Sequence, residues 1–455
     1  MSDLLTVILA AGKGTRMKSA LPKVLHTVGG KPMVQQVLDA ANQAGSSRNI
    51  VVVGFGADQV EEVIGTQAEF VVQEQQLGTG HAVRQAERLL TDFNGTVMVL
   101  CGDTPLLEGK TLAELYAAHQ AAGAAATVLT ARMPDPAGYG RVIRDDSGRV
   151  LKIVEQKDAN PAELAVNEVN TGIYCFDREA LFEALAAINC ANQQGEYYLT
   201  DVIGILTGQK AKVGAVVAED YQQTLGINSR LQLAAAEKIL RRRKLNEVME
   251  NGVTIMDPDS TFIDAEVTIE PDTVIYPFTW LEGATTIGRG CSIGPGTRIQ
   301  NTKIGDEVTL QFTYAHDCRV ENHVTVGPYV HLRPDTVLSE GVKVGNFVEV
   351  KNSQVGKNSK IPHLSYIGDT DMGARVNIGS GTITVNYDGK TKHRTTIEDE
   401  AFIGCNSNLV APVTVGKGAY IGAGSTITKN VPSVGLGVAR ARQVNIEGWV
   451  GKRKS

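Results

Sequence analysis

Two different spacings of apolar residues run along the chain. Up to about residue 228, short apolar runs such as NIVVVGF at 49–55 and TVMVLCGD at 96–103 alternate with segments of helical spacing, such as TLAELYAAHQAA at 111–122. Alternation of this kind is typical of a mostly parallel sheet with helices on both faces. The pattern therefore predicts an α/β domain over residues 1–228.

A long amphipathic segment, SRLQLAAAEKILRRRKLNEVMENG, follows this domain and ends at Gly252. A glycine directly after the last helical residue is a common stop signal. We interpret residues 229–251 as a linker helix and expect a second domain over residues 252–455.

Beyond the linker, aliphatic residues recur every six positions, a period that neither a helix nor an ordinary strand has. Such a hexapeptide repeat is typical of a parallel β-helix, in which each hexapeptide forms one side of a triangular coil and its aliphatic points inward. The repeat shifts in phase between runs. Its members are Ile287, Ile293, Ile299, Val326, Leu332, Leu338, Val344, Val350, Val355, Ile361, Ile367, Met372, Ile378, Ile397, Ile403, Leu409, Val415, Ile421 and Ile427.

The repeat is interrupted once. After Ile378 the next inward position holds Thr384, and the pattern resumes only at Ile397. We expect the polar segment NYDGKTKHR at 386–394 to leave the coil as a loop, because insertions in a solenoid map to one face, often the binding face.

Composition and charge exclude several classes of protein. Aromatic residues make up only 5% of the chain, which suits a narrow β-helix interior, and the net charge of −6 gives no basic footprint for nucleic acid. No apolar segment approaches the roughly 20 residues that span a bilayer, so we predict a cytoplasmic protein without membrane contact. The six cysteines show no metal-type spacing, and we expect them to be reduced.

The segment LAAGKGTRM at 9–17 is the first candidate for chemistry, because it links an apolar strand to a helix. Glycines in such a loop let backbone N–H groups approach an anion, and cations nearby neutralise it. The spacing fits neither a P-loop nor a dinucleotide fingerprint. A plain glycine turn is the alternative.

More polar features join this loop along the first domain. They are PK at 22–23, LGTGHA at 77–82, Asp103 after the apolar run VMVLC, Gly140, Glu155, Asn170 and Asn228. On its own, Asp103 before Thr104 and Pro105 could be a turn residue, and Glu155 could be a surface carboxylate.

With these motifs, the chain resembles the sugar-nucleotidyltransferase family, and more closely the bifunctional N-acetylglucosamine-1-phosphate uridyltransferases and glucosamine-1-phosphate acetyltransferases. The resemblance rests on G-x-G-T-R-M…P-K and L-G-T-G-H-A and extends through HLRP at 331–334 and GNFVEVK at 345–351. It implies a Rossmann-like nucleotidyltransferase domain followed by a left-handed parallel β-helix of hexapeptide repeats with a C-terminal tail.

The resemblance also implies two reactions in bacterial cell-wall precursor synthesis. Acetyl-CoA acetylates glucosamine 1-phosphate, and the product then reacts with UTP to give UDP-N-acetylglucosamine and pyrophosphate. Such a protein is expected to be a homotrimer through its β-helix.

For the uridyltransferase site, the resemblance assigns Mg²⁺ to Asp103 and Asn228, and assigns Arg16 and Lys23 to the phosphates. Oxygen ligands suit Mg²⁺, and cations are needed because two like charges 4 Å apart repel by about 4 kcal/mol at an effective dielectric of 20. The other residues implied to bind UTP or the sugar nucleotide are Leu9, Ala10, Ala11, Gly12, Gln73, Gly78, Thr79, Gly102, Gly140, Glu155 and Asn170.

For the acetyltransferase site, His363 is the candidate general base, because an amine attacks a thioester only when it is unprotonated. A lone histidine is more often structural, but here it lies in an unusually polar part of the repeat. The residues implied to bind glucosamine 1-phosphate are Arg333, Lys351, Tyr366, Asn377 and Lys392. Those implied to bind acetyl-CoA are Ser380, Asn386, Tyr387, Cys405, Ala423 and Arg440.

Two positions depart from the family pattern: Ser380 stands where relatives often have Ala, and Cys405 where they often have Ser. Cys405 could therefore be proposed as an acyl-carrying nucleophile, but direct transfer with His363 as base is simpler. Two other functions stay open. One is a single-activity sugar-1-phosphate nucleotidyltransferase with a structural or regulatory β-helix, and the other is a non-catalytic β-helix scaffold with a nucleotide-sensing domain.

Overall fold

The computed structural model describes residues 3–450, and the chain divides into two compact units, Met1–Leu240 and Arg241–Ser455. The division falls within helix α8 (Arg230–Glu250), at the segment that the sequence predicts as a linker. In the described part of the chain, no helix is long and apolar enough to cross a membrane.

The first unit is built on a nine-stranded sheet whose main path is β11-β7-β10-β6-β1-β4-β5. Neighbours are parallel except β10, which is antiparallel to β6 and β7, so the predicted mostly parallel sheet is confirmed. The strands are β1 (Leu4–Leu9), β4 (Arg48–Val53), β5 (Glu69–Val72), β6 (Thr96–Cys101), β7 (Ala126–Arg132), β8 (Arg141–Arg144), β9 (Val150–Val154), β10 (Glu168–Asp177) and β11 (Val213–Val217), with a separate pair β2 (Thr27–Val28) and β3 (Lys31–Pro32).

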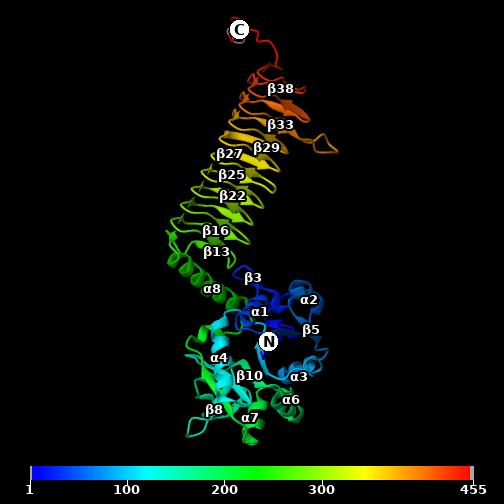
Figure 1. The fold of residues 1–455 in the computed structure, drawn as a ribbon, viewed down its shortest axis with the longest axis vertical. Helices are drawn as coiled ribbons and strands as arrows, with labels where there is room; N and C mark the ends of the chain where they lie inside the picture. Colours follow the sequence, from blue (N-terminus) through cyan, green and yellow to red (C-terminus); the bar gives the residue numbers. More distant parts are fainter. Residues whose placement is uncertain (1–2, 451–455) are drawn as a thin grey trace. The chain divides into compact units, whose positions relative to one another are not determined.

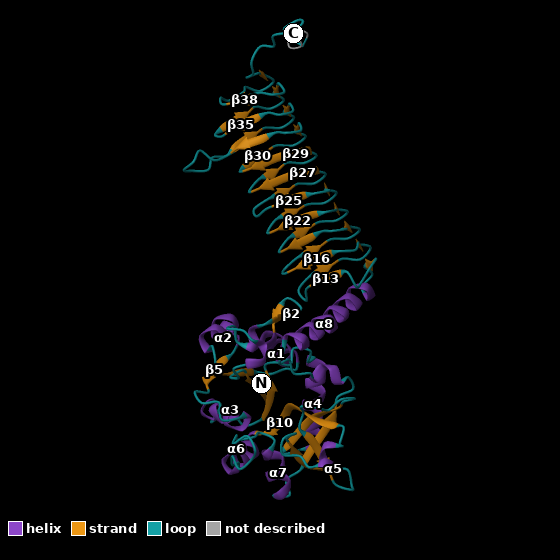
Figure 2. Cartoon of the chain, turned by 180° about the vertical axis from the view of Figure 1, so that it is seen from behind, coloured by secondary structure: helices purple, strands orange, loops and turns teal. Residues whose placement is uncertain are grey.

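Helices cover both faces of this sheet, as Figure 2 shows. Alternate residues of β1 point to opposite faces: Leu5 and Val7 enter one buried cluster, and Leu4 and Ile8 enter another. The first cluster contains residues of α3 (Thr79–Gln85), α6 (Arg178–Ala187) and α7 (Asp201–Gly208). The second contains residues of α1 (Met33–Gln43), α2 (Ala57–Ile64) and α4 (Gly109–Ala122). The remaining short helices are α5 (Pro161–Leu164), η1 (Thr15–Met17), η2 (Lys23–Leu25), η3 (Gly65–Gln67), η4 (Glu87–Leu89) and η5 (Tyr221–Thr224).

The second unit is a left-handed parallel β-helix, whose stacked coils are visible in Figure 1. One wall is a nine-stranded sheet: β14 (Thr268–Ile269), β17 (Thr286–Ile287), β20 (Lys303–Ile304), β23 (Arg319–Val320), β26 (Val337–Leu338), β28 (Gln354–Val355), β30 (Thr370–Met372), β33 (Thr395–Ile397) and β36 (Val413–Val415).

The other two walls form one continuous sheet of nineteen strands, because β27 and β29 turn the corner between them. The strands are β12 (Thr254–Ile255), β13 (Thr261–Ile263), β15 (Val274–Ile275), β16 (Thr279–Glu282), β18 (Ser292–Ile293), β19 (Arg298–Gln300), β21 (Thr309–Leu310), β22 (Thr313–His316), β24 (Thr325–Val326), β25 (Val330–Leu332), β27 (Lys343–Lys351), β29 (Lys360–Gly368), β31 (Asn377–Ile378), β32 (Ile383–Val385), β34 (Phe402–Ile403), β35 (Asn408–Val410), β37 (Tyr420–Ile421), β38 (Thr426–Ile427) and β39 (Leu436–Gly437).

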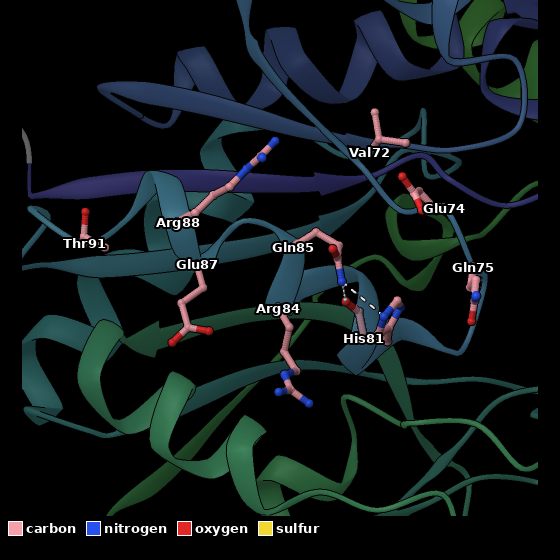
Figure 3. Close-up of a pocket in the computed structure, with 9 residues that line it drawn as sticks. All are labelled: Val72, Glu74, Gln75, His81, Arg84, Gln85, Glu87, Arg88 and Thr91. Carbon is pink, nitrogen blue, oxygen red and sulfur yellow. Dashed lines mark hydrogen bonds between the residues drawn. The ribbon is translucent and has the colours of Figure 1, made fainter.

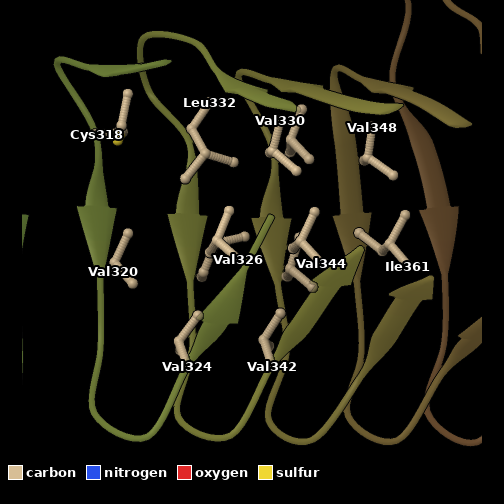
Figure 4. Close-up of a cluster of buried hydrophobic side chains, with 14 of the residues drawn as sticks. Cys318, Val320, Val324, Val326, Val330, Leu332, Val342, Val344, Val348 and Ile361 are labelled. Carbon is tan, nitrogen blue, oxygen red and sulfur yellow. The ribbon is translucent and has the colours of Figure 1, made fainter. Parts of the chain in front are cut away.

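Every aliphatic residue of the predicted six-residue repeat is buried in one continuous core. Figure 4 shows the inward side chains of successive coils lying one above another. Val326 pairs with Val344, 18 residues later, whereas Val344 pairs with Ile361, 17 residues later. The phase shifts in the sequence therefore mark coils that are one residue shorter.

The predicted loop is also confirmed. Pairing between β30 and β33 joins residues 25 positions apart, Thr370 with Thr395, where the preceding step joins Gln354 with Asp371, 17 apart. Residues 387–392 are exposed, and Figure 1 shows this segment projecting beside β33. Thr384, which replaces the expected aliphatic, is fully buried, and its hydroxyl accepts the Gly368 N–H at 2.7 Å.

Replacing one inward residue should destabilise the β-helix in proportion to the cavity left behind. We expect Leu338→Ala to lower the free energy of unfolding by about 2–5 kcal/mol, because this side chain is fully buried. Val337→Ala, which alters the outward neighbour on β26, is the control and should cost less than about 1 kcal/mol. Urea denaturation followed by the fluorescence of Trp280 measures both, and equal losses would contradict the inward assignment.

Candidate active sites

A cavity of about 250 Å³ lies where β1 and β6 end. These strands are parallel neighbours, so the loops that follow them meet at the same edge of the sheet. Nine of the residues expected at the nucleotide site line this cavity: Leu9, Ala10, Ala11, Gly12, Lys23, Gln73, Gly78, Thr79 and Asp103. Gly102 lies beside them, and its N–H donates to the Leu9 carbonyl at 2.9 Å.

Lys23, Asp103 and Asn228 form the charged centre of this site. The Lys23 ammonium donates to the Asp103 carboxylate and, at 3.0 Å, to Asn228 Oδ1. Asn228 is brought there because the Ile227 N–H donates to the Asp103 carbonyl at 2.8 Å. One cation already bridges the two oxygens, so a carboxylate and an amide oxygen converge as a Mg²⁺ site requires.

The glycine-rich loop is shaped around Lys23. Gly14 has φ of +59°, and a Cβ there would lie 2.5 Å from the Lys23 Cβ. Only glycine lets the loop adopt this conformation and approach the lysine so closely. Arg16 is exposed on η1 and does not line the cavity.

The three expected sugar-binding residues lie close to one another, although none of them lines this cavity. The Asn170 N–H donates to the Gly140 carbonyl at 2.9 Å, and a Cβ on Gly140 would lie 3.5 Å from Glu155 Oε1. Burial raises the pKa of Glu155, although the Thr200 hydroxyl donates to its carboxylate at 3.2 Å.

A second, larger hollow of about 780 Å³ flanks helix α3 and shares no lining residue with the first (Figure 3). One residue of this hollow contacts a residue of the nucleotide site. His81 in its wall lies 3.0 Å, through Nδ1, from the amide nitrogen of Gln73, which also donates to the Gly78 carbonyl at 3.1 Å.

In the β-helix, His363 belongs to a column of residues that repeats at one corner of successive coils. The registers of β29 with β31, β31 with β34 and β34 with β37 place Ser380, Cys405 and Ala423 in line with it. The Arg440 guanidinium donates to the Ala423 carbonyl at 3.0 Å. Four expected acetyl-CoA residues therefore form a line that leads away from the candidate base.

His363 itself is exposed, and its Nδ1 lies 2.8 Å from Asn346 Oδ1 on the neighbouring coil. Since that oxygen can only accept, Nδ1 is the nitrogen that carries the proton, and in the neutral ring Nε2 is the nitrogen with the lone pair. Asn346 thus orients the ring so that Nε2 can accept a proton.

Cationic side chains gather on the next stretch of the same coils. Arg333 and Lys351 follow paired residues of β25 and β27, and the Arg333 guanidinium donates to Glu349 at 2.8 Å. Lys392 is close enough to Lys351 for that neighbour to lower the pKa of Lys392. Asn377 begins β31, one coil after Lys360.

Asn386 and Tyr387 begin the projecting loop. The Asn386 amide donates to the Asp369 carboxylate and, at 3.4 Å, to the Tyr366 hydroxyl. Asn386 thus contacts Tyr366, an expected sugar-phosphate residue. The Tyr387 hydroxyl donates to the Gly389 carbonyl within the loop at 2.8 Å.

Comparison with known proteins finds relatives for both parts of the chain. Residues 5–240 match the family described as Nucleotidyl transferase, and residues 394–429 match Bacterial transferase hexapeptide (six repeats). A bifunctional protein GlmU of Geobacillus sp. (strain WCH70) is 56% identical over 98% of this chain and 97% of its own length. That of Geobacillus thermodenitrificans is 55% identical over 99% of both chains. The chain belongs to the GlmU family of bifunctional enzymes.

Several residues that sequence reasoning missed lie in the two candidate sites. Glu196 lines the nucleotide cavity, Asn346 orients His363, and Asp369 contacts both Asn386 and, at 3.9 Å, Lys351. Cys101 also lines the cavity, but burial raises the pKa of its thiol to about 12, which makes it an inert packing residue. The strand registers that bring these residues together span tens of residues, so no local motif marks them.

The glycine loop offers a direct test of the nucleotide site. We expect Gly14→Ala to lower the rate of nucleotidyl transfer at least about tenfold, because the new Cβ displaces Lys23 and the loop must strain. Release of pyrophosphate measures the effect. Gly208→Ala, in α7 with nothing within 4 Å of the new Cβ, is the control. Equal rates for the two variants would show that the position of Lys23 is not critical.

Proposed function

We propose that this protein makes UDP-N-acetylglucosamine in two steps, acetylating glucosamine 1-phosphate at the β-helix and transferring uridylate at the α/β unit. The observation that carries the proposal is the presence of two different, complete constellations in one chain. One joins Lys23, Asp103 and Asn228, and the other joins His363 to a column of small residues and a group of cations. The GlmU family supports the same pair of activities.

In the acetyl transfer step, Nε2 of His363 accepts a proton from the ammonium group of glucosamine 1-phosphate, which leaves a free amine. The amine nitrogen bonds to the thioester carbonyl carbon and the C–S bond breaks; the protonated His363 returns its proton to the coenzyme A thiolate, and the extra proton on the new amide nitrogen passes to solvent. Arg333, Lys351 and Lys392 would hold the substrate phosphate, with Tyr366 and Asn377 positioning the sugar.

The column His363–Ser380–Cys405–Ala423 gives acetyl-CoA a path along the β-helix. Small side chains leave room for an extended ligand, and Arg440 at the far end supplies a cation for its phosphates. Asn386 and Tyr387 on the projecting loop would contact the same ligand. In this arrangement Cys405 contributes its backbone and its small size, and no acyl-enzyme is needed.

In the uridylyl transfer step, an oxygen of N-acetylglucosamine 1-phosphate bonds to the α-phosphorus of UTP, and the bond to pyrophosphate breaks. Lys23 and Arg16 stabilise the negative charge that both phosphates bring together. Asp103 and Asn228 would hold Mg²⁺, which neutralises phosphate charge when bound. The nucleotide would rest on 9–12, Gln73, Gly78, Thr79 and Gly102, and the sugar on Gly140, Glu155 and Asn170.

We also propose that the protein is a cytoplasmic homotrimer assembled through one corner of the β-helix. Large apolar side chains occupy that corner on successive coils, and all are exposed: Phe312, Tyr329, Phe347 and Leu364. The ring centroids of Phe312 and Tyr329 lie 5.4 Å apart with the rings tilted, and those of Tyr329 and Phe347 lie 5.4 Å apart with the rings stacked. Leu364 directly follows His363, so a second copy on this stripe would lie against the acetyl-transfer site.

A charge on the apolar stripe should break the trimer. We expect wild type to sediment at about three times 48.6 kDa, and Tyr329→Asp to sediment near 48.6 kDa. Aspartate tolerates the left-handed backbone that Tyr329 adopts, so the fold should persist. Phe402→Asp, at an exposed site of β34 outside this stripe, is the control. A trimeric Tyr329→Asp would assign the interface elsewhere.

The two activities should separate cleanly by mutation. We expect His363→Ala to lower thiol release from acetyl-CoA about 10²–10⁴-fold while pyrophosphate release from UTP and N-acetylglucosamine 1-phosphate continues. Asp103→Ala should do the reverse, and chelation of Mg²⁺ should act like Asp103→Ala. If wild type releases no thiol with glucosamine 1-phosphate, the β-helix is structural and the single-activity alternative holds.

A further inference from the structure

Asp369 is a buried carboxylate to which the proposed mechanism gives no role. It lies at the corner after β29, is only 4% exposed and has a left-handed backbone with φ of 48°. Strand register places it between Asn352 and Asn386 on adjoining coils, and both amides donate to its carboxylate, one to each oxygen. Each oxygen is therefore engaged.

The surroundings of Asp369 are cationic. Lys351 Nζ lies 3.9 Å from Oδ2, and both Lys392 and Arg394 experience the field of this carboxylate. Lys351 and Lys392 are close enough to repel each other before any phosphate arrives. A buried negative charge beneath them offsets this repulsion in the free protein.

Asp369 also fixes the base of the projecting loop that carries Lys392. The loop is a hairpin closed by an antiparallel bridge between Tyr387 and Lys392, and the His393 N–H donates to the Asn386 carbonyl at 2.8 Å. Asn386, at its first position, is held by the Asp369 carboxylate, while Arg394, at its last, pairs with Asp371. The hairpin is thus tied to the coil at both ends by acidic residues.

We propose that Asp369 is a positioning residue for acetyl transfer, whose charge holds Lys351 and, through Asn386, the Lys392 hairpin in place for the phosphate of the sugar substrate. This inference rests on the proposed acetyl-transfer site. It differs from a plain corner role, because corner residues need a left-handed backbone and a hydrogen bond to the coil below but no negative charge.

Asp369→Asn separates the two roles. Asparagine adopts the left-handed corner readily and keeps an acceptor for Asn352, but it removes the charge and turns an amide donor toward the Asn386 amide, so the hairpin loses its acceptor as well. We expect the KM for glucosamine 1-phosphate to rise about tenfold or more, with kcat changed less than about threefold, because binding of the phosphate is what the charge prepares. Asp369→Glu, which restores the charge, should recover part of the affinity.

Asp317→Asn is the matched control. Asp317 is also a left-handed corner residue with φ of 50°. Its carboxylate accepts from the Asn301 amide at 3.3 Å and lies 3.2 Å from His316 Nδ1, but no lysine among residues 3–450 pairs with it. Its KM should stay within about twofold of wild type. The midpoint of urea denaturation checks that the β-helix of each variant is folded, and pyrophosphate release at the other site, measured on the same samples, checks the α/β unit.

The pH dependence gives a readout that a structural role would not move. Lys351 lowers the pKa of Lys392, and Asp369 and Tyr366 offset part of that shift. His393, Asp388 and Lys390 lie on the same hairpin, and Arg394 is paired with Asp371. Removing the Asp369 charge lowers the pKa of Lys392 further. The alkaline rise in KM should therefore begin at lower pH in Asp369→Asn than in wild type.

The possible outcomes test the role of Asp369 separately from the proposed acetyl transfer. A wild type that releases no coenzyme A thiol would overturn the acetyl-transfer site itself. An active wild type with an unchanged or lower KM and an unshifted pH profile in Asp369→Asn would leave acetyl transfer in place and overturn the role of Asp369. Equal effects of Asp369→Asn and Asp317→Asn would reduce Asp369 to a corner residue.

Discussion

Parallel strand pairing is the constraint on which both sites depend. A parallel neighbour repeats the same position at the same edge or corner, so residues far apart in sequence become adjacent without any dedicated contact. In the first unit this brings the loops after β1 and β6 together, and with them Lys23 and Asp103. In the β-helix it aligns His363, Ser380, Cys405 and Ala423 on successive coils. One geometric rule thus produces a compact cavity in one fold and an extended column in the other.

Both sites hold a lysine against an acid before substrate arrives. Lys23 pairs with Asp103, and Lys351 lies by Asp369. Phosphate-binding cations must be gathered, yet gathered cations repel one another. In the free protein, a carboxylate beside the cations offsets this repulsion. When the substrate phosphate supplies the negative charge instead, the carboxylate is free to bind another ligand. In the first site the released carboxylate suits Mg²⁺, whereas in the second Asn352 and Asn386 occupy both oxygens, so Asp369 stays fixed as a support.

The periodic features were predictable from the sequence because they repeat. A six-residue period can be followed along the whole second half of the sequence. Each predicted inward aliphatic is buried, including those on either side of a phase shift. The interruption after Ile378 likewise predicted the projecting loop. Motif residues such as Leu9 to Gly12, which line the cavity, could be named from the sequence because they are neighbours in one motif. Asp369, Asn346 and Glu196 were not, because each acts through a partner brought near by folding. An aspartate at a left-handed corner also looks like any other corner residue, as Asp317 does.

The interrupted repeat explains why the candidate acetyl-transfer residues are concentrated on these coils. A regular coil presents one outward residue per position and cannot surround a ligand, because its backbone is committed to pairing with the coils above and below. The hairpin at 386–394 does not pair with neighbouring coils, so it can carry Lys392 out from the wall. Thr384 and Asn386 keep the base of the hairpin in register through hydrogen bonds to Gly368 and Asp369. The β-helix thus keeps its core continuous while one coil gains a side chain from outside the stack. The site lies where regular pairing gives way to an insertion that the coil below holds in place.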